Sequence, residues 1–176
     1  LAEKRFLEAA KVKVAPWAAV ETEAELVAAV QKLGLPAVLK TTRLGYDGKG
    51  QAKLLAQEDL APAFARLNPK PLVLEKFVDF ACEVSVVVAR GADGTVACFD
   101  TVENRHHDHI LHATFAPARI TPALAQAAQQ AAVKVANAIG LVGLLCVEFF
   151  VDHDGRVLAN EIAPRVHNSG HWTIEA

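Results

Sequence analysis

Two glutamates near the carboxyl end of the chain are the residues best suited to chemistry. Glu148 and Glu161 lie in two apolar segments joined by Asp154-Gly155, a dipeptide that favours a two-residue type I′ hairpin turn. That turn places His153 opposite Arg156 and Glu148 opposite Glu161, with Cβ atoms about 5 Å apart. Neighbouring carboxylates repel each other unless a cation lies between them, and Mg²⁺ binds one or two protein carboxylates together with phosphates and water. The pair therefore predicts a magnesium site, the alternative being two glutamates on a solvated face.

A glycine-rich segment that follows Lys40 is the second candidate. It consists of Gly45, Tyr46, Asp47, Gly48, Lys49, Gly50 and Gln51. Its glycines let the backbone fold closely around phosphates and present N–H groups, while Lys40 and Lys49 supply positive charge. It is not a Walker A loop, because Gly-Gln follows the lysine and a strand comes next. The segment predicts a phosphate-binding lid at a hairpin tip, and an ordinary polar tip is the alternative.

Two further segments carry groups that a ligand could reach. Glu75-Lys-Phe-Val78 ends an apolar strand, where backbone groups could pair with an adenine edge and Glu83 could accept from a ribose hydroxyl. Residues 164–172, directly after the second glutamate, combine Arg165 with hydrogen-bonding groups, as functional loops often do. The alternatives are a plain strand end followed by a glutamate, and a loop with satisfied polar groups.

The histidines and cysteines do not predict a zinc site. His106, His107, His109 and His112 crowd one segment, but no cysteine or second histidine pair at ligand spacing accompanies them. The three cysteines, at positions 82, 98 and 146, are odd in number and far apart in apolar runs. That usage is typical of reduced, buried thiols in a cytosolic protein.

The composition is that of a soluble globular protein. Hydrophobic residues make up 52% of the 176 and charged ones 22%, which excludes a disordered or fibrous chain. The net charge of −2, without runs of like charge, argues against broad binding of nucleic acid or anionic lipid. Neither a signal peptide nor an apolar run near the roughly 20 residues of a membrane span is present. We therefore expect a cytoplasmic protein that holds anionic ligands locally.

Periodicity and turn signals predict the elements that position these residues. Thr22 and Glu25 form a capping box for a helix that ends at Gly34. A long helix begins at Thr121-Pro122 and stops at Gly140. A shorter helix is predicted over 58–67, and strands over 37–41, 51–55, 72–77, 83–90, 95–104, 110–115, 143–151 and 156–162.

Helices mixed with antiparallel hairpins, without regular alternation of strand and helix, predict an α+β fold of two lobes. We expect the lobes to be residues 1–78, with the glycine-rich lid, and 79–176, with the metal-binding hairpin. The chain opens inside a helix and closes just after its most polar segment. We therefore expect a piece of a larger enzyme, without flanking amino- and carboxy-terminal domains.

These motifs, in this order, resemble those of the ATP-grasp superfamily over essentially the whole chain. The matching residues are Lys40, Gly45 to Gln51, Glu75 to Val78, Glu83, Glu148 and Asn160-Glu-Ile-Ala-Pro-Arg165. Within the superfamily, Gly45 to Gln51, Glu103-Asn-Arg-His106 and 160–173 are similar to the 5-(carboxyamino)imidazole ribonucleotide synthases. The resemblance implies the ATP-grasp fold, in which two lobes with mainly antiparallel sheets clamp the nucleotide.

The resemblance also implies a role for each matched residue. Nucleotide contacts would come from Lys40, the glycine-rich segment, Glu75, Lys76, Phe77, Val78, Glu83, His106, Asn160 and Glu161. Glu148 and Glu161 would bind magnesium. The substrate side would hold Tyr46, Asp47, Arg165, His167 and Asn168, and the catalytic residues would be Lys40 and Arg165.

The reaction implied by the resemblance is an ATP-dependent ligation in purine biosynthesis. Bicarbonate and 5-aminoimidazole ribonucleotide would be the small-molecule substrates, ATP and Mg²⁺ the cofactors, and carboxyphosphate the intermediate. The full-length enzyme could form a homodimer. Many ATP-grasp enzymes have a third metal ligand, Asn, where this chain has Ala163. Two alternatives stay open: another ATP-grasp ligase, of the biotin carboxylase or formate-dependent transformylase type, and a non-catalytic ATP-binding module.

Overall fold

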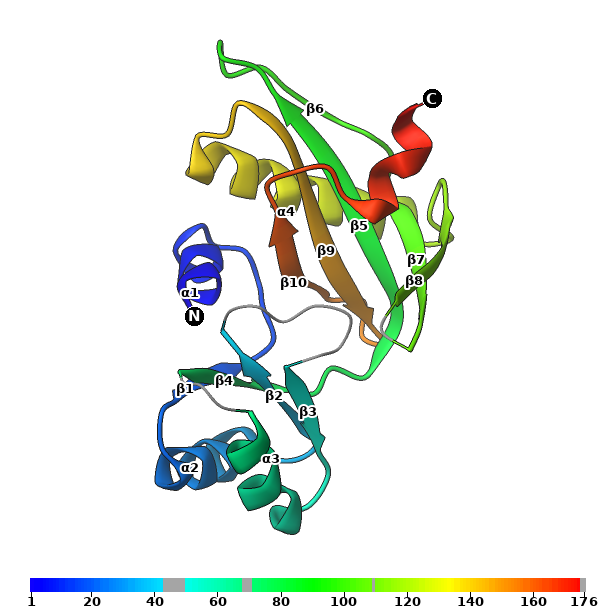
Figure 1. The fold of residues 1–176 in the computed structure, drawn as a ribbon. Helices are drawn as coiled ribbons and strands as arrows, with labels where there is room; N and C mark the ends of the chain where they lie inside the picture. The colour runs from blue at the N-terminus through cyan, green and yellow to red at the C-terminus, as the bar shows by residue number, and fades with distance from the viewer. Residues whose placement is uncertain (43–49, 68–70, 109, 175–176) are drawn as a thin grey trace. The chain divides into compact units, whose positions relative to one another are not determined.

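The computed structural model describes residues 1–42, 50–67, 71–108 and 110–174. The chain forms two compact units, the first made of Leu1, 15–78 and 108–110 and the second of 2–14, 79–107 and 111–176. Each unit combines helices with antiparallel strands (Figure 1). The predicted α+β class is thereby confirmed. Among the described residues, no helix is long and apolar enough to cross a membrane.

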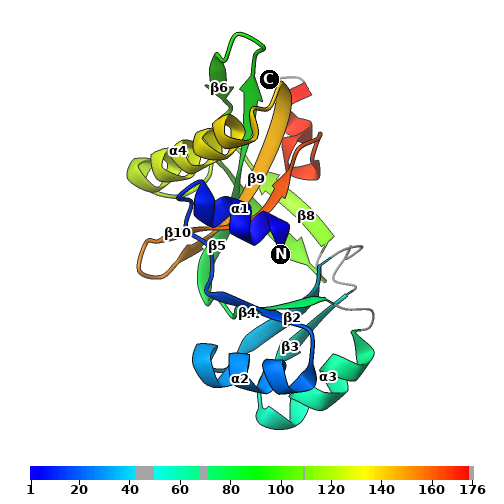
Figure 2. The ribbon, with the colours of Figure 1, turned by 90° about the vertical axis from the view of Figure 1, so that its left-hand side faces the viewer.

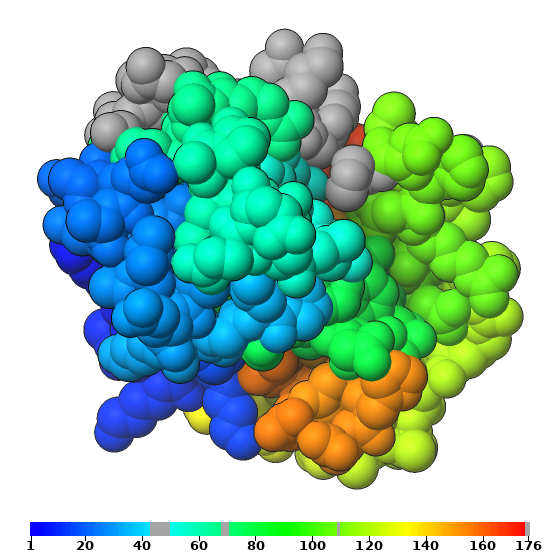
Figure 3. All heavy atoms as spheres, turned by 90° about the horizontal axis from the view of Figure 1, so that it is seen from below, coloured from blue at the N-terminus to red at the C-terminus, as the bar shows by residue number. Residues whose placement is uncertain are grey.

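The first unit is a four-stranded antiparallel sheet with helices on one side (Figure 2). Its strand order is β1-β4-β2-β3, with bounds β1 Trp17–Val20, β2 Ala37–Thr41, β3 Gln51–Leu54 and β4 Leu72–Lys76. Its helices are α2 Glu23–Leu33, the 3₁₀ turn η1 Gln57–Asp59 and α3 Leu60–Arg66. Leu26 of α2 and Leu60 of α3 share one core with Leu39 and Leu74 of the sheet. The outer faces of α2 and α3 lie side by side at the surface (Figure 3).

The second unit is built on a six-stranded sheet in which β5 pairs with β6, β7 and β9. The path is β10-β9-β5-β7-β8. The strands are β5 Phe80–Arg90, β6 Val96–Cys98, β7 Val102–His107, β8 Ile110–Phe115, β9 Gly143–Asp152 and β10 Val157–Ala163. The helices are α1 Ala2–Ala9, α4 Pro122–Ile139 and the 3₁₀ segment η2 Asn168–Ile174.

The two faces of this second sheet differ in character. Val84 and Val86 of β5 and Val147 and Phe149 of β9 are buried in one core with residues of α1 and α4. Because successive side chains of a strand point to opposite faces, the residues between them face away from the helices. That other face carries Glu83, Ser85, Cys146 and Glu148. One face of the sheet therefore packs into the hydrophobic core, while the other face carries polar side chains.

The amino-terminal helix departs from the predicted lobes. Residues 2–14 belong to the second unit, although the sequence placed all of 1–78 in the first lobe. Leu7 and Val12 are buried in the core of the second unit, and the backbone N–H of Ala159 donates to the Lys13 carbonyl at 2.8 Å. A short amphipathic helix can join either of two cores, and its sequence does not report which one it joins.

Local signals placed most elements correctly. The capping box of α2 is present, with reciprocal bonds between Thr22 and Glu25, and α4 begins after Thr121 and ends at a left-handed Gly140. The predicted 95–104 strand is divided into β6 and β7. The predicted 58–67 helix begins as η1, where the Asp59 carboxylate accepts from the N–H groups of residues 55 and 56.

Candidate active site

Glu148 and Glu161 are cross-strand neighbours, as predicted, but the turn between their strands differs from the prediction. The N–H of Asp152 donates to the Arg156 carbonyl at 3.0 Å, so three residues form the loop, and Gly155 has a φ of 76°. This is the three-residue hairpin loop with a left-handed glycine. The predicted type I′ turn, with His153 opposite Arg156, is therefore wrong.

A β-bulge in β10 restores the pairing of the two glutamates. Near the turn Ala159 pairs with Phe149, and the register shifts before Glu161, so Asn160 is the extra residue of the bulge. Without the shift, Glu161 would pair with Val147. The prediction of the glutamate pair was thus correct although its derivation contained two errors, a turn one residue too short and an unrecognised bulge, which cancel.

The electrostatics of the pair are those of two neighbouring carboxylates, one of them buried. Burial and the nearby Glu161 charge raise the pKa of Glu148 to about 7, and only 15% of its side chain is exposed. No group of three or more His, Cys, Asp or Glu among the described residues could hold a metal by itself. Ala163, the expected place of a third ligand, is buried. Two carboxylates still fit Mg²⁺, because phosphates and water complete its shell.

The raised pKa of Glu148 predicts a stability effect in the absence of metal. A carboxyl group whose pKa is higher in the folded than in the unfolded chain stabilises the fold while protonated. Its contribution is fully present below the ordinary pKa of 4.5 and is lost as pH rises through about 7. We expect Glu148→Gln, in excess chelator, to raise the melting temperature relative to wild type more at pH 8 than at pH 5. An equal difference at both pH values would contradict this, and Glu8→Gln, at an exposed site on α1, is the control.

Glu83 and His106 form a second polar pair on neighbouring strands. His106 Nδ1 lies 2.5 Å from Glu83 Oε2, and this contact raises the pKa of His106. The positive charge of His106 in turn acts to lower the pKa of Glu148. Two residues predicted to contact the nucleotide are therefore brought together and are coupled to the paired glutamates.

The segment after β10 brings a further predicted residue to the glutamates. His167 Nε2 lies 3.7 Å from Glu148 Oε1, and burial lowers the pKa of His167. A Cβ built on Gly170 would lie 3.1 Å from Val87 Cγ2, so the absence of a side chain lets this segment approach β5 closely. Arg165 is exposed and donates to the Val166 carbonyl at 2.9 Å, while Asn168 begins η2.

In the first unit, Lys40 is already paired. Its Nζ lies 3.2 Å from Glu75 Oε2, and the Glu75 side chain is 7% exposed. The N–H groups of Lys76 and Phe77 donate to the carbonyls of residues 16 and 36, so these two donors are used within the unit. These two N–H groups are therefore not available to an adenine edge.

The glycine-rich lid is described only at its end. Gly45, Tyr46, Asp47, Gly48 and Lys49 lie outside the described residues, as does His109. Gly50 has a φ of 83°, its carbonyl accepts from Thr41 N–H at 2.8 Å, and Gln51 pairs with Lys40 in the β2–β3 ladder. The roles of the five undescribed lid residues stay predictions.

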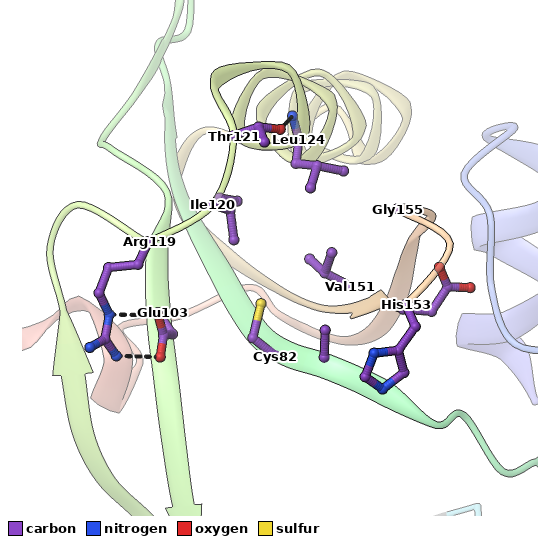
Figure 4. A pocket seen from close by; sticks show the side chains of 11 residues that line it. Cys82, Glu103, Arg119, Ile120, Thr121, Leu124, Val151, His153 and Gly155 are labelled. Atoms are coloured by element: carbon purple, nitrogen blue, oxygen red, sulfur yellow. Dashed lines mark hydrogen bonds and ion pairs between the residues drawn. The ribbon is translucent and has the colours of Figure 1, made fainter.

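A pocket of about 610 Å³ lies in the second unit away from these residues (Figure 4). Its lining includes Cys82, the start of α4 at Thr121, and the Glu103–Arg119 ion pair, whose Nε–Oε2 distance is 3.0 Å. None of the predicted site residues lines it. Burial raises the pKa of the Cys82 thiol, which makes it a poor nucleophile. We assign no reaction to this pocket.

The sequence that forms this site matches one known protein family. The ATP-grasp domain family matches residues 5–176. The chain belongs to the ATP-grasp family. The predicted ATP-grasp fold is confirmed by solved structures of similar proteins.

Three relatives illustrate the similarity. The N5-carboxyaminoimidazole ribonucleotide synthase of Brucella melitensis is 51% identical over 176 residues, which cover 99% of this chain and 49% of the relative. The Staphylococcus aureus synthetase complexed with ADP has a TM-score of 0.92 at 38% identity, covering 99% and 46% of the two chains. The Aspergillus clavatus enzyme with ADP and 5-aminoimidazole ribonucleotide has a TM-score of 0.89 at 34% identity, covering 98% and 45%. This chain spans about half the length of these relatives.

Proposed function

We propose that the protein is a carboxylate-amine ligase that carboxylates 5-aminoimidazole ribonucleotide with bicarbonate at the expense of ATP. The products would be 5-(carboxyamino)imidazole ribonucleotide, ADP and phosphate. The observation that carries the proposal is the glutamate pair at the Asn160 bulge, with His106 and His167 beside it. A relative of that activity, 51% identical over the length of this chain, supports it.

Glu148 and Glu161 would hold the magnesium ion. The ion, when bound, would neutralise charge on the phosphates of ATP. The contribution of the chain is to present two carboxylates from adjacent strands, whose mutual repulsion a bound cation relieves. The bulge serves this arrangement, because it sets the register that pairs the two residues.

Each unit carries residues that we propose to contact the nucleotide. In the first, Lys40 would contact the phosphates, and the buried Glu75 at 3.2 Å would hold its ammonium group in place. Val78 would contribute a backbone contact to adenine. In the second, Glu83 would accept from the ribose, while His106, 2.5 Å from it, would fix the orientation of its carboxylate. Asn160 and the lid residues would complete the contacts.

The substrate side would lie beside Glu148. His167 is 3.7 Å from that carboxylate, and Arg165 and Asn168 lie within two residues of His167 in the chain. The substrate contacts of Tyr46 and Asp47 in the lid stay predictions. Transfer of the terminal phosphoryl group to bicarbonate would give ADP and carboxyphosphate. The amine of the ribonucleotide would then attack the carbon of carboxyphosphate and displace phosphate, or attack the carbon dioxide formed when phosphate leaves first. Positioning and charge neutralisation dominate such a step. Arg165 and Lys40 would neutralise the developing charge.

Acceptor dependence of ATP hydrolysis tests this proposal. The protein that carries this sequence would be given ATP, Mg²⁺ and bicarbonate, and ADP would be measured with 5-aminoimidazole ribonucleotide, with biotin, or with formate and candidate amines. We expect stimulation by 5-aminoimidazole ribonucleotide, dependent on bicarbonate. Stimulation by another acceptor would favour a different ATP-grasp ligase, and ATP binding without hydrolysis would favour a non-catalytic module. A cytoplasmic location and a homodimer stay predictions.

A further inference from the structure

A buried chain of hydroxyl and amide groups connects β8, β7 and β5 to His167 within the second unit. Thr114 Oγ1 lies 3.0 Å from Asn104 Oδ1, and Asn104 Nδ2 lies 2.9 Å from Ser85 Oγ. Ser85 Oγ is 2.8 Å from Ser169 Oγ, which is 3.0 Å from His167 Nδ1. Ser85 and Ser169 are fully buried and Asn104 is 4% exposed. Buried polar groups that all have hydrogen-bond partners tend to hold one arrangement.

The amide of Asn104 gives this series of hydrogen bonds a direction. Its oxygen accepts from the Thr114 hydroxyl, so its nitrogen, which can only donate, faces Ser85. Ser85 Oγ therefore accepts, and its single proton goes to Ser169 Oγ. The single proton of Ser169 is then directed to Nδ1 of His167. With the amide in this orientation, each link has one donor and one acceptor.

A second donor independently points at the same nitrogen. The backbone N–H of Ser169 lies 3.4 Å from His167 Nδ1, and a backbone N–H cannot accept. Cys146 Sγ, 3.4 Å from Ser169 Oγ, does not oppose this direction, because its thiol can donate to that oxygen. His167 Nδ1 is therefore an acceptor. A neutral imidazole with an accepting Nδ1 carries its proton on Nε2, the nitrogen 3.7 Å from Glu148 Oε1.

We propose that Asn104, Ser85 and Ser169 are positioning residues that hold His167 in the tautomer protonated at Nε2, with this N–H directed toward the Glu148 side of the site. An N–H fixed in this way is a hydrogen-bond donor for an anionic oxygen bound beside Glu148. It cannot act there as a base. The consequence for turnover rests on the proposed function, whereas the tautomer itself is a property of the folded chain.

Nitrogen NMR of the histidine rings tests the tautomer directly. Long-range proton–nitrogen correlation of the ¹⁵N-labelled protein at neutral pH, with His167 assigned by its loss in His167→Gln, distinguishes protonated from unprotonated ring nitrogens. We expect an unprotonated Nδ1 and a protonated Nε2. Protonation of Nδ1, alone or together with Nε2, would overturn the proposal.

Variants test whether the chain of donors sets this state. Ser169→Ala, which removes the hydroxyl 3.0 Å from Nδ1, should shift both His167 nitrogens toward values of a tautomer mixture. It should also lower kcat about 10-fold, the low end of the range for losing a partner that orients a metal ligand, with KM for ATP unchanged. Thr101→Val, which removes another buried hydroxyl of this unit, should change neither. Wild-type nitrogen shifts in Ser169→Ala would overturn the proposal. Absence of carboxylation by the wild-type protein would instead count against the proposed function, because the nitrogen shifts do not depend on turnover.

Discussion

Glu161→Gln is expected to lower magnesium-dependent ATP turnover by at least about 100-fold while leaving the fold intact. Loss of a partner that only orients a metal ligand typically costs 10- to 100-fold, so loss of a proposed ligand should cost no less. Glu161 is exposed, and its charge is one cause of the raised pKa of Glu148. Its removal therefore relieves repulsion in the metal-free protein and should not destabilise it.

The measurement is ADP formation as a function of magnesium concentration, with melting temperature as the check on folding. Glu8→Gln removes the same charge from an exposed position on α1 and should behave as wild type. Partial recovery of the Glu161→Gln rate at high magnesium concentration would agree with a weakened metal site. A near wild-type rate at all concentrations would refute the metal assignment.

Lys40→Met is expected to weaken ATP binding about 10- to 100-fold, the range for a lost hydrogen bond to a charged group. The turnover loss should be larger, about 100-fold or more, because preorganised cations act most strongly on transition-state charge. The substitution also removes the Glu75 ion pair, so some loss of stability accompanies it. Lys40→Arg keeps the charge and should recover part of the affinity.

Isothermal titration with ATP and with ADP separates these effects. Lys32→Met, at an exposed position in the last turn of α2, is the matched control and should bind as wild type. If Lys40→Met bound both nucleotides with unchanged affinity while remaining folded, Lys40 would have no phosphate contact and the proposed nucleotide site would have to be revised.

The hairpin of β9 and β10 shows how far sequence reasoning reaches. Asp154-Gly155 correctly indicated a turn, and the apolar segments around it correctly indicated two paired strands. The exact loop length and the Asn160 bulge were not readable, because both depend on how the strands twist against the rest of the sheet. The glutamate pair was predicted from the register of a two-residue turn, and the prediction was correct because the bulge offsets the longer loop.

The buried partners of the site show the opposite case. Ser85 lies in the run Val84-Ser-Val-Val-Val88 and Ser169 is 84 positions away, so no local spacing connects them. A small polar residue inside an apolar strand indicates a buried hydrogen bond, but it does not indicate which residue is the partner. Charged site residues stood out by type, whereas the neutral residues that orient His167 did not.

The sequence by itself determined the family of the chain and those helices and strands whose ends and faces are set by nearby residues. Capping residues, turn glycines and alternating hydrophobicity act within a few residues, so α2, α4 and the main strands follow from them. The tertiary structure decided which core α1 joins, how β10 is registered against β9, and which hydroxyls contact His167. These outcomes depend on contacts between segments far apart in the chain, where packing and hydrogen-bond satisfaction select among arrangements that the local sequence permits equally.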